Sequence, residues 1–124
     1  MVTGHTRESV MPASAVIDLE HLARYTGGDA ALNAEILRLF DSQASELVIR
    51  LRTILESRDA KSWREVTHTI KGAARGVGAF ALADAAAQCE RIGLDDHRTA
   101  SLAIDQLDVE AGAVQRFIHG QSKA

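Results

Sequence analysis

The chain has 124 residues, of which 46% are hydrophobic and 25% are charged, a composition ordinary for one small globular domain. Its net charge of −3 at pH 7 lacks the basic excess of a general nucleic-acid binder. The single cysteine, Cys89, excludes an internal disulfide and fits a reducing compartment, and no apolar run is long enough to cross a membrane. We therefore expect a cytoplasmic protein that binds neither nucleic acid nor membrane.

The hydrophobic spacing predicts helices throughout, because nothing in the sequence alternates with the period of a strand. Apolar residues recur at intervals of three and four in five segments, at about 16–25, 30–57, 62–77, 80–92 and 99–118. Asp29 is a good cap for the second helix. The third helix can begin after Asp59, or at Ser62 with Glu65 completing a capping box.

The connections between these segments are short, so neighbouring helices are expected to pack antiparallel. The predicted fold is all-α, an antiparallel up-down four-helix bundle with an additional short N-terminal helix. The bundle is assigned to residues 15–120, between a flexible N-terminal tail (1–14) and a short C-terminal tail (121–124). Each helix carries one apolar stripe. The bundle buries these stripes and leaves none for a second copy of the chain, so we expect a monomer.

One histidine has an unusual set of neighbours on the third predicted helix. His68 falls almost opposite the middle of the apolar stripe and is expected to point into solvent. Four cations lie within roughly 60° of it around the helix axis: Lys61, Arg64, Lys71 and Arg75. Gly72, one turn further on, leaves bare backbone beside the imidazole. A nucleophilic ring among cations, beside a missing side chain, indicates a site for a phosphoryl group on histidine.

The segment from His68 to Ala74 reads His-Thr-Ile-Lys-Gly-Ala-Ala and is followed by Gly78 and by Leu82-Ala83. This pattern resembles the HxxKG(S/A)(S/A) signature of histidine-containing phosphotransfer (HPt) domains, and the resemblance covers about 16–118. It implies a phosphorelay role, in which His68 accepts a phosphoryl group from an aspartyl phosphate on a receiver domain and passes it to another. In the family the reactive nitrogen is the one farther from the backbone, here Nε2.

The resemblance also assigns roles to neighbouring residues. Lys71 would place an ammonium near the phosphoryl oxygens, and Gly72 would leave room for the partner. Arg64 and Arg75 either steer an acidic partner or keep the helix soluble, and the sequence leaves both interpretations open. Family members often place a polar residue of the next helix near the phosphoacceptor, which points to Glu90, with Gln88 nearby.

The expected partners are response-regulator receiver domains and a hybrid histidine kinase. The chain has no glycine-rich phosphate loop, so we expect a phosphocarrier that does not bind ATP and is not itself an enzyme. It has no carboxylate cluster suited to Mg²⁺, which would come from the receiver, and we expect no cofactor of its own. The remaining histidines show no metal-ligand spacing: His5, His21, His97 and His119.

Two other classes of protein fit part of the pattern. One is the dimerisation and phosphoacceptor domain of a histidine kinase, which usually follows its histidine with an acidic residue, whereas this chain has Thr69. That class also supplies two long helices per chain, whereas four are predicted here. The other is a non-catalytic helical-bundle interaction module, against which the complete set of His68, Lys71 and Gly72 argues.

Overall fold

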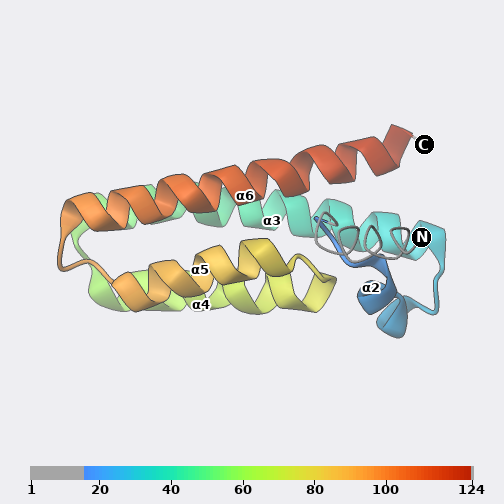
Figure 1. Ribbon diagram of the computed structural model, residues 1–124, viewed down its shortest axis with the longest axis horizontal. Helices are drawn as coiled ribbons and strands as arrows, with labels where there is room; N and C mark the ends of the chain where they lie inside the picture. The colour runs from blue at the N-terminus through green and yellow to red at the C-terminus, as the bar shows by residue number, and fades with distance from the viewer. Residues whose placement is uncertain (1–15, 124) are drawn as a thin grey trace, which may run out of the picture.

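The structure, a computed structural model, describes residues 16–123. Within this range the chain forms helices and no strands, in the order α2 (Leu19–Thr26), α3 (Ala30–Ser57), α4 (Ala60–Val77), α5 (Phe80–Ile92) and α6 (His97–Lys123). The four longer helices run up and down as an antiparallel bundle, and short α2 lies at one end (Figure 1). The predicted fold class is confirmed.

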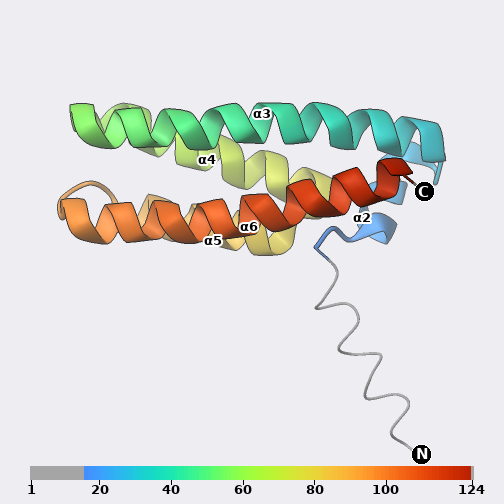
Figure 2. The same cartoon turned by 90° about the horizontal axis from the view of Figure 1, so that it is seen from above.

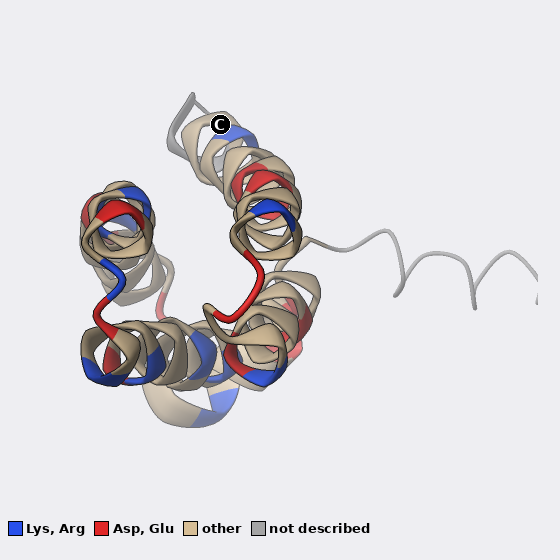
Figure 3. Ribbon diagram, turned by 90° about the vertical axis from the view of Figure 1, so that its left-hand side faces the viewer, with Lys and Arg blue, Asp and Glu red and all other residues tan. Residues whose placement is uncertain are grey.

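The four bundle helices close into a ring. Helix α3 packs against α4 and α6, and α5 packs against the same two helices, whereas α2 contacts α3 and α4. In the end-on view the bundle helices lie around a common axis (Figure 3), and their buried side chains form one core. Helices α3 and α6 run the full length of the bundle, and α6 ends near the N-terminal end of α3 (Figure 2). No helix among residues 16–123 is long and apolar enough to span a membrane.

Aspartates begin three of the helices. The side chains of Asp18, Asp29 and Asp59 each accept a hydrogen bond from the backbone N–H three residues further on, which satisfies a donor that has no partner inside the helix. Asp59 also decides between the two starts predicted for the third helix. Helix α4 begins at Ala60, so Asp59 and not Ser62 is its cap.

The last helix is longer than predicted. It begins at His97 rather than 99, because the Asp96 carboxylate already accepts hydrogen bonds from the backbone of Arg98 and the hydroxyl of Thr99. It continues to Lys123 rather than 118, and so enters the segment 121–124 for which a tail is predicted. Gly120, the glycine just before that segment, lies within the helix and does not end it. The tail predicted at 1–14 lies outside the described residues.

The core fixes the rotation of α4 about its own axis. Trp63, Val66, Ile70 and Ala74 are buried, as the apolar stripe predicts. The indole Nε1 of Trp63 also donates a hydrogen bond of 2.9 Å to the carbonyl of Cys89 on α5. A buried aromatic that is hydrogen-bonded to the neighbouring helix leaves little freedom to turn. The opposite face of α4 is therefore held towards solvent.

Gly78 ends α4 and is predicted to be intolerant of a side chain. Its φ is +86°, and an added Cβ would lie 2.7 Å from the backbone oxygen of Asp18. We expect Gly78→Ala to lower the free energy of unfolding by about 1–3 kcal/mol from backbone strain, with the steric clash adding to that loss. Gly76→Ala is the matched control, because its Cβ would meet no atom within 4 Å, and it should stabilise by about 0.5–1 kcal/mol. Urea unfolding of both variants measures the difference, and equal effects would contradict the prediction.

Candidate functional site

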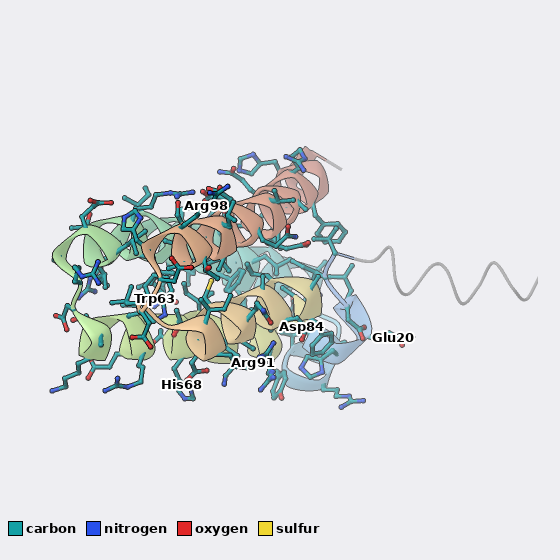
Figure 4. All side chains as sticks on the ribbon, turned by 60° about the vertical axis from the view of Figure 1, so that its left-hand side comes forward. Glu20, Trp63, His68, Asp84, Arg91 and Arg98 are labelled. Atoms are coloured by element: carbon teal, nitrogen blue, oxygen red, sulfur yellow. The ribbon has the colours of Figure 1, made fainter. Side chains whose placement is uncertain are left out.

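His68 lies on the solvent face of α4. Its side chain is 69% exposed, whereas Thr67 and Ile70 of the same helix are buried. In Figure 4 the imidazole points outward from the lower edge of the bundle, while Trp63 of the same helix lies between the two helix layers. The predicted exposure of the histidine is confirmed, and its ring is accessible to another protein.

The four cations predicted around this histidine differ in how far their side chains are exposed. Lys61, Arg64 and Arg75 are exposed on the same face of α4 as His68. In the end-on view, Lys and Arg segments gather along the lower edge of the bundle (Figure 3). Lys71 differs, because its side chain is only 20% exposed and lies at the boundary between α4 and α5. Three cations thus face solvent, and the fourth is held against the neighbouring helix.

Glu90 of α5 lies between Lys71 and His68 and contacts both side chains. The Lys71 ammonium Nζ donates a hydrogen bond of 2.8 Å to Glu90 Oε1. The second carboxylate oxygen, Oε2, lies 3.6 Å from Nδ1 of His68, which is longer than a hydrogen bond. The hydrogen bond from Lys71 lowers the pKa of the Glu90 carboxyl, so Glu90 is ionised at neutral pH. The sequence placed Glu90 near the histidine but did not reveal its pairing with Lys71.

Gln88, the other residue suggested on α5, has a different partner. It is exposed, and its side-chain oxygen accepts a hydrogen bond from Arg91 on the same helix. The contact between α5 and the imidazole is therefore made by Glu90. Cys89 stands between Gln88 and Glu90 in the sequence but points into the core, where it is fully buried. Burial raises the pKa of its thiol to about 11. The cysteine is a protonated core residue rather than a second nucleophile.

Gly72 lies beside His68 in open space. It is exposed, and a Cβ built on it would meet no atom within 4 Å. Close packing by another helix of the bundle therefore does not require a glycine here. Glycine in a helix costs roughly 0.5–1 kcal/mol relative to alanine, and packing within the bundle does not account for that cost at Gly72.

An aromatic cluster on the surface was missed at the sequence level. The rings of His21 and Tyr25 on α2 lie 5.7 Å apart, and those of His21 and Phe80 lie 5.2 Å apart, both edge to face. Tyr25 is 69% exposed and Phe80 is 43% exposed. The spacing of His21 and Tyr25 by four residues was a signal for their contact. The contact of Phe80 with His21, in contrast, could be seen only in the folded structure. We call these three residues the aromatic cluster.

Metal-ligating side chains do not gather within the described part of the chain. No group of three or more histidine, cysteine, aspartate or glutamate residues among them is placed to hold a metal ion. The chemistry available at the site is thus that of an imidazole, an ammonium–carboxylate pair and three exposed cations.

Comparison with known proteins agrees with this arrangement. The model of the Hpt domain family matches residues 35–119, which is more than half of the chain. Among solved structures, the fold is similar to that of histidine-containing phosphotransfer protein B from Pseudomonas aeruginosa PAO1, with a TM-score of 0.75 and 21% sequence identity over 90% of this chain and 98% of that chain. No curated protein sequence matches significantly. The chain therefore belongs to the Hpt domain family and takes part in histidine phosphotransfer in two-component phosphorelays.

Proposed function

We propose that His68 is the phosphoacceptor of this domain. The observation that supports this most directly is the 69% exposed imidazole, held by the buried face of α4 among outward-facing cations. Its Nε2 lone pair attacks the phosphorus of an aspartyl phosphate on a receiver domain. The N–P bond forms as the P–O bond to the aspartate breaks, and the electron pair of that bond remains on the aspartate oxygen. The reverse step passes the phosphoryl group to another receiver.

Lys71 stabilises the charge that develops on the phosphoryl oxygens. Its ammonium is held 2.8 Å from Glu90 Oε1 beside the histidine, and an ammonium has three N–H donors. It can therefore keep the bond to Glu90 and still donate to a phosphoryl oxygen. Arg64 and Arg75 are exposed on the same face and attract the acidic pocket of the receiver from a distance.

The domain acts as a phosphocarrier that depends on its partners for the rest of the chemistry. Members of the Hpt family interact with receiver domains and histidine kinases, and we propose response-regulator receivers and a hybrid kinase as the partners of this chain. The receiver supplies the aspartyl phosphate and its Mg²⁺, and the chain itself binds neither nucleotide nor cofactor. We propose that it works as a cytoplasmic monomer.

Phosphorylation by a receiver tests this function. The full chain is incubated with a receiver domain carrying a radiolabelled aspartyl phosphate in the presence of Mg²⁺. Label should move to the chain as a phosphate that is labile in acid and stable in alkali, as a phosphoramidate is. Absence of transfer from a panel of receivers would support the interaction-module alternative. Self-labelling from ATP would support a kinase activity and contradict the phosphocarrier assignment.

Gly72 tests where the receiver docks. Gly72→Gln should slow transfer from the receiver by about tenfold or more, because the new side chain fills space that the partner needs. Gly72→Ala should instead stabilise α4 by about 0.5–1 kcal/mol. The control is Gly120→Gln on α6, an exposed helical glycine whose Cβ also meets no atom within 4 Å. Stopped-flow transfer rates with one receiver measure the difference, and equal rates for the two Gln variants would place the docking surface elsewhere.

A further inference from the structure

The aromatic cluster lies on the surface where α2 folds against the end of α4. The ring of His21 lies edge to face against both Tyr25 and Phe80, with ring centres 5.7 and 5.2 Å away. Tyr25 and Phe80 are both exposed. Adjacent exposed aromatic side chains, unlike apolar residues scattered singly over a surface, are typical of a contact with another protein.

The attachment of α2 to the bundle does not account for these exposed rings. Ile17, just before α2, and Leu22 within it are buried, and the backbone N–H of Asp18 donates to the carbonyl of Gly78 at 2.9 Å. Since Tyr25 is mostly in solvent, its ring contributes little to the stability of the fold. The same anchoring holds the cluster in one place relative to α4, so little freedom is lost when a partner binds.

The cluster lies within reach of a partner centred on His68. Gly78, which leads into Phe80, follows His68 by about 15 Å along α4. An interface of standard size buries about 800 Å² on each partner, equivalent to a disc of roughly 16 Å radius. In Figure 4, α2 extends to the same lower edge of the molecule from which His68 points outward. A receiver that covers the histidine can therefore also contact the aromatic cluster.

The stretch of α4 between the histidine and the cluster leaves room for such a partner. Gly72 and Gly76 are exposed, and an added Cβ at either would meet no atom within 4 Å. They lie about 40° and 80° from His68 around the helix, in the direction opposite to Lys71, which contacts α5. That direction leads towards α2, because α2 packs against α3 and α4.

We propose that the aromatic cluster is a docking contact for the receiver, in which Tyr25 and Phe80 bind an apolar patch of the partner and help to determine which receivers are accepted. This inference rests on the proposed function of His68 and extends it to the choice of partner. The exposed cations of α4 attract acidic surfaces in general. An apolar contact depends on the shape and composition of the facing surface, so it discriminates between receivers. Because the rings lie about 15 Å from the histidine, they act on binding and not on the transfer step.

Binding of unphosphorylated receivers tests the contact without any transfer. A panel of purified receiver domains is titrated into the full chain by isothermal titration calorimetry. For the receiver that binds most tightly, Tyr25→Ala and Phe80→Ala should each raise the dissociation constant about tenfold, a loss typical of an aromatic contact residue. Tyr25→Phe should bind as the wild type does, because the ring makes the contact. Ile49→Ala is the control, since Ile49 is as exposed as Tyr25, at 69%, but lies on the seam between α3 and α6.

Transfer rates separate docking from chemistry. With the same receiver, both alanine variants should raise the receiver concentration for half-maximal labelling about tenfold and leave the rate at saturation unchanged. Urea unfolding checks that the fold is intact, and Tyr25→Ala decides the outcome if Phe80→Ala does not fold.

Three results would overturn the inference: unchanged binding in Tyr25→Ala, a lower rate at saturation, or no binding by any receiver. Self-association of the chain that Tyr25→Ala abolishes would also overturn it, because the cluster would then bind a second copy. Binding that depends on Tyr25 without any labelling of the chain would contradict the proposed function of His68 and leave the docking contact standing. The two failures are thus distinguishable.

Discussion

His68→Gln is expected to abolish phosphoryl acceptance from any receiver. Glutamine has no nitrogen lone pair that can attack phosphorus, so the reaction loses its nucleophile rather than part of its stabilisation. The side chain is 69% exposed and contributes little to the core, so the free energy of unfolding should change by no more than about 0.5 kcal/mol. Labelling with a phosphorylated receiver and urea unfolding measure the two effects.

His97→Gln is the matched control for this prediction. His97 is also exposed, at the start of α6, and its Nε2 lies 3.2 Å from a carboxylate oxygen of Glu56. Among the described residues, an exposed histidine lies beside a carboxylate three times: His68 by Glu90 within the cationic face, and His97 by Glu56 and His119 by Asp41 outside it. His97→Gln should retain full labelling. Residual label on the His68 variant would show that another residue accepts the phosphoryl group.

The exposure of His68 could be predicted because it depends on one helix alone. The apolar residues of α4, from Trp63 to Val77, require one face to be buried, and the period of the helix then sets the direction of every other side chain. The cations Lys61, Arg64 and Arg75 follow from the same rotation. The bundle itself was predictable because each segment has one apolar stripe and the connections are short.

The pairing of Lys71 with Glu90 depends on two helices and could not be predicted in the same way. Whether an ammonium on α4 meets a carboxylate on α5 is decided by how far one helix is shifted along the other. The hydrogen bond from Trp63 to the Cys89 carbonyl helps to fix that shift, since it ties one residue of each helix together. For this reason Lys71, which the sequence groups with the exposed cations around His68, is half-buried.

The aromatic cluster depends on three elements. Phe80 meets His21 because α2 folds back against the end of α4, where the backbone N–H of Asp18 donates to the carbonyl of Gly78 at 2.9 Å. The aspartate and the glycine are each readable as a helix cap and a helix end, but their contact with one another is not a local property of the sequence.

Lys71→Ala is expected to slow phosphotransfer by roughly tenfold to several hundredfold, the range seen when one donor to developing negative charge is removed. The ammonium is held beside His68 by its 2.8 Å bond to Glu90, so its position needs no rearrangement before transfer. Lys61→Ala is the control. It removes the same charge from the same face of α4 at an exposed position nearly two turns from His68, and should slow transfer by only about twofold.

The loss in Lys71→Ala contains a second contribution, because the variant leaves the Glu90 carboxylate without the ammonium that balances its charge. That carboxylate would then face an incoming phosphoryl group as an uncompensated like charge. Combining Lys71→Ala with Glu90→Gln removes this repulsion, so the double variant should lose less than the product of the two single losses. Single-turnover rates for the four proteins with one receiver give the coupling. Losses that simply multiply would mean that Lys71 and Glu90 act on the phosphoryl group independently, in spite of their hydrogen bond.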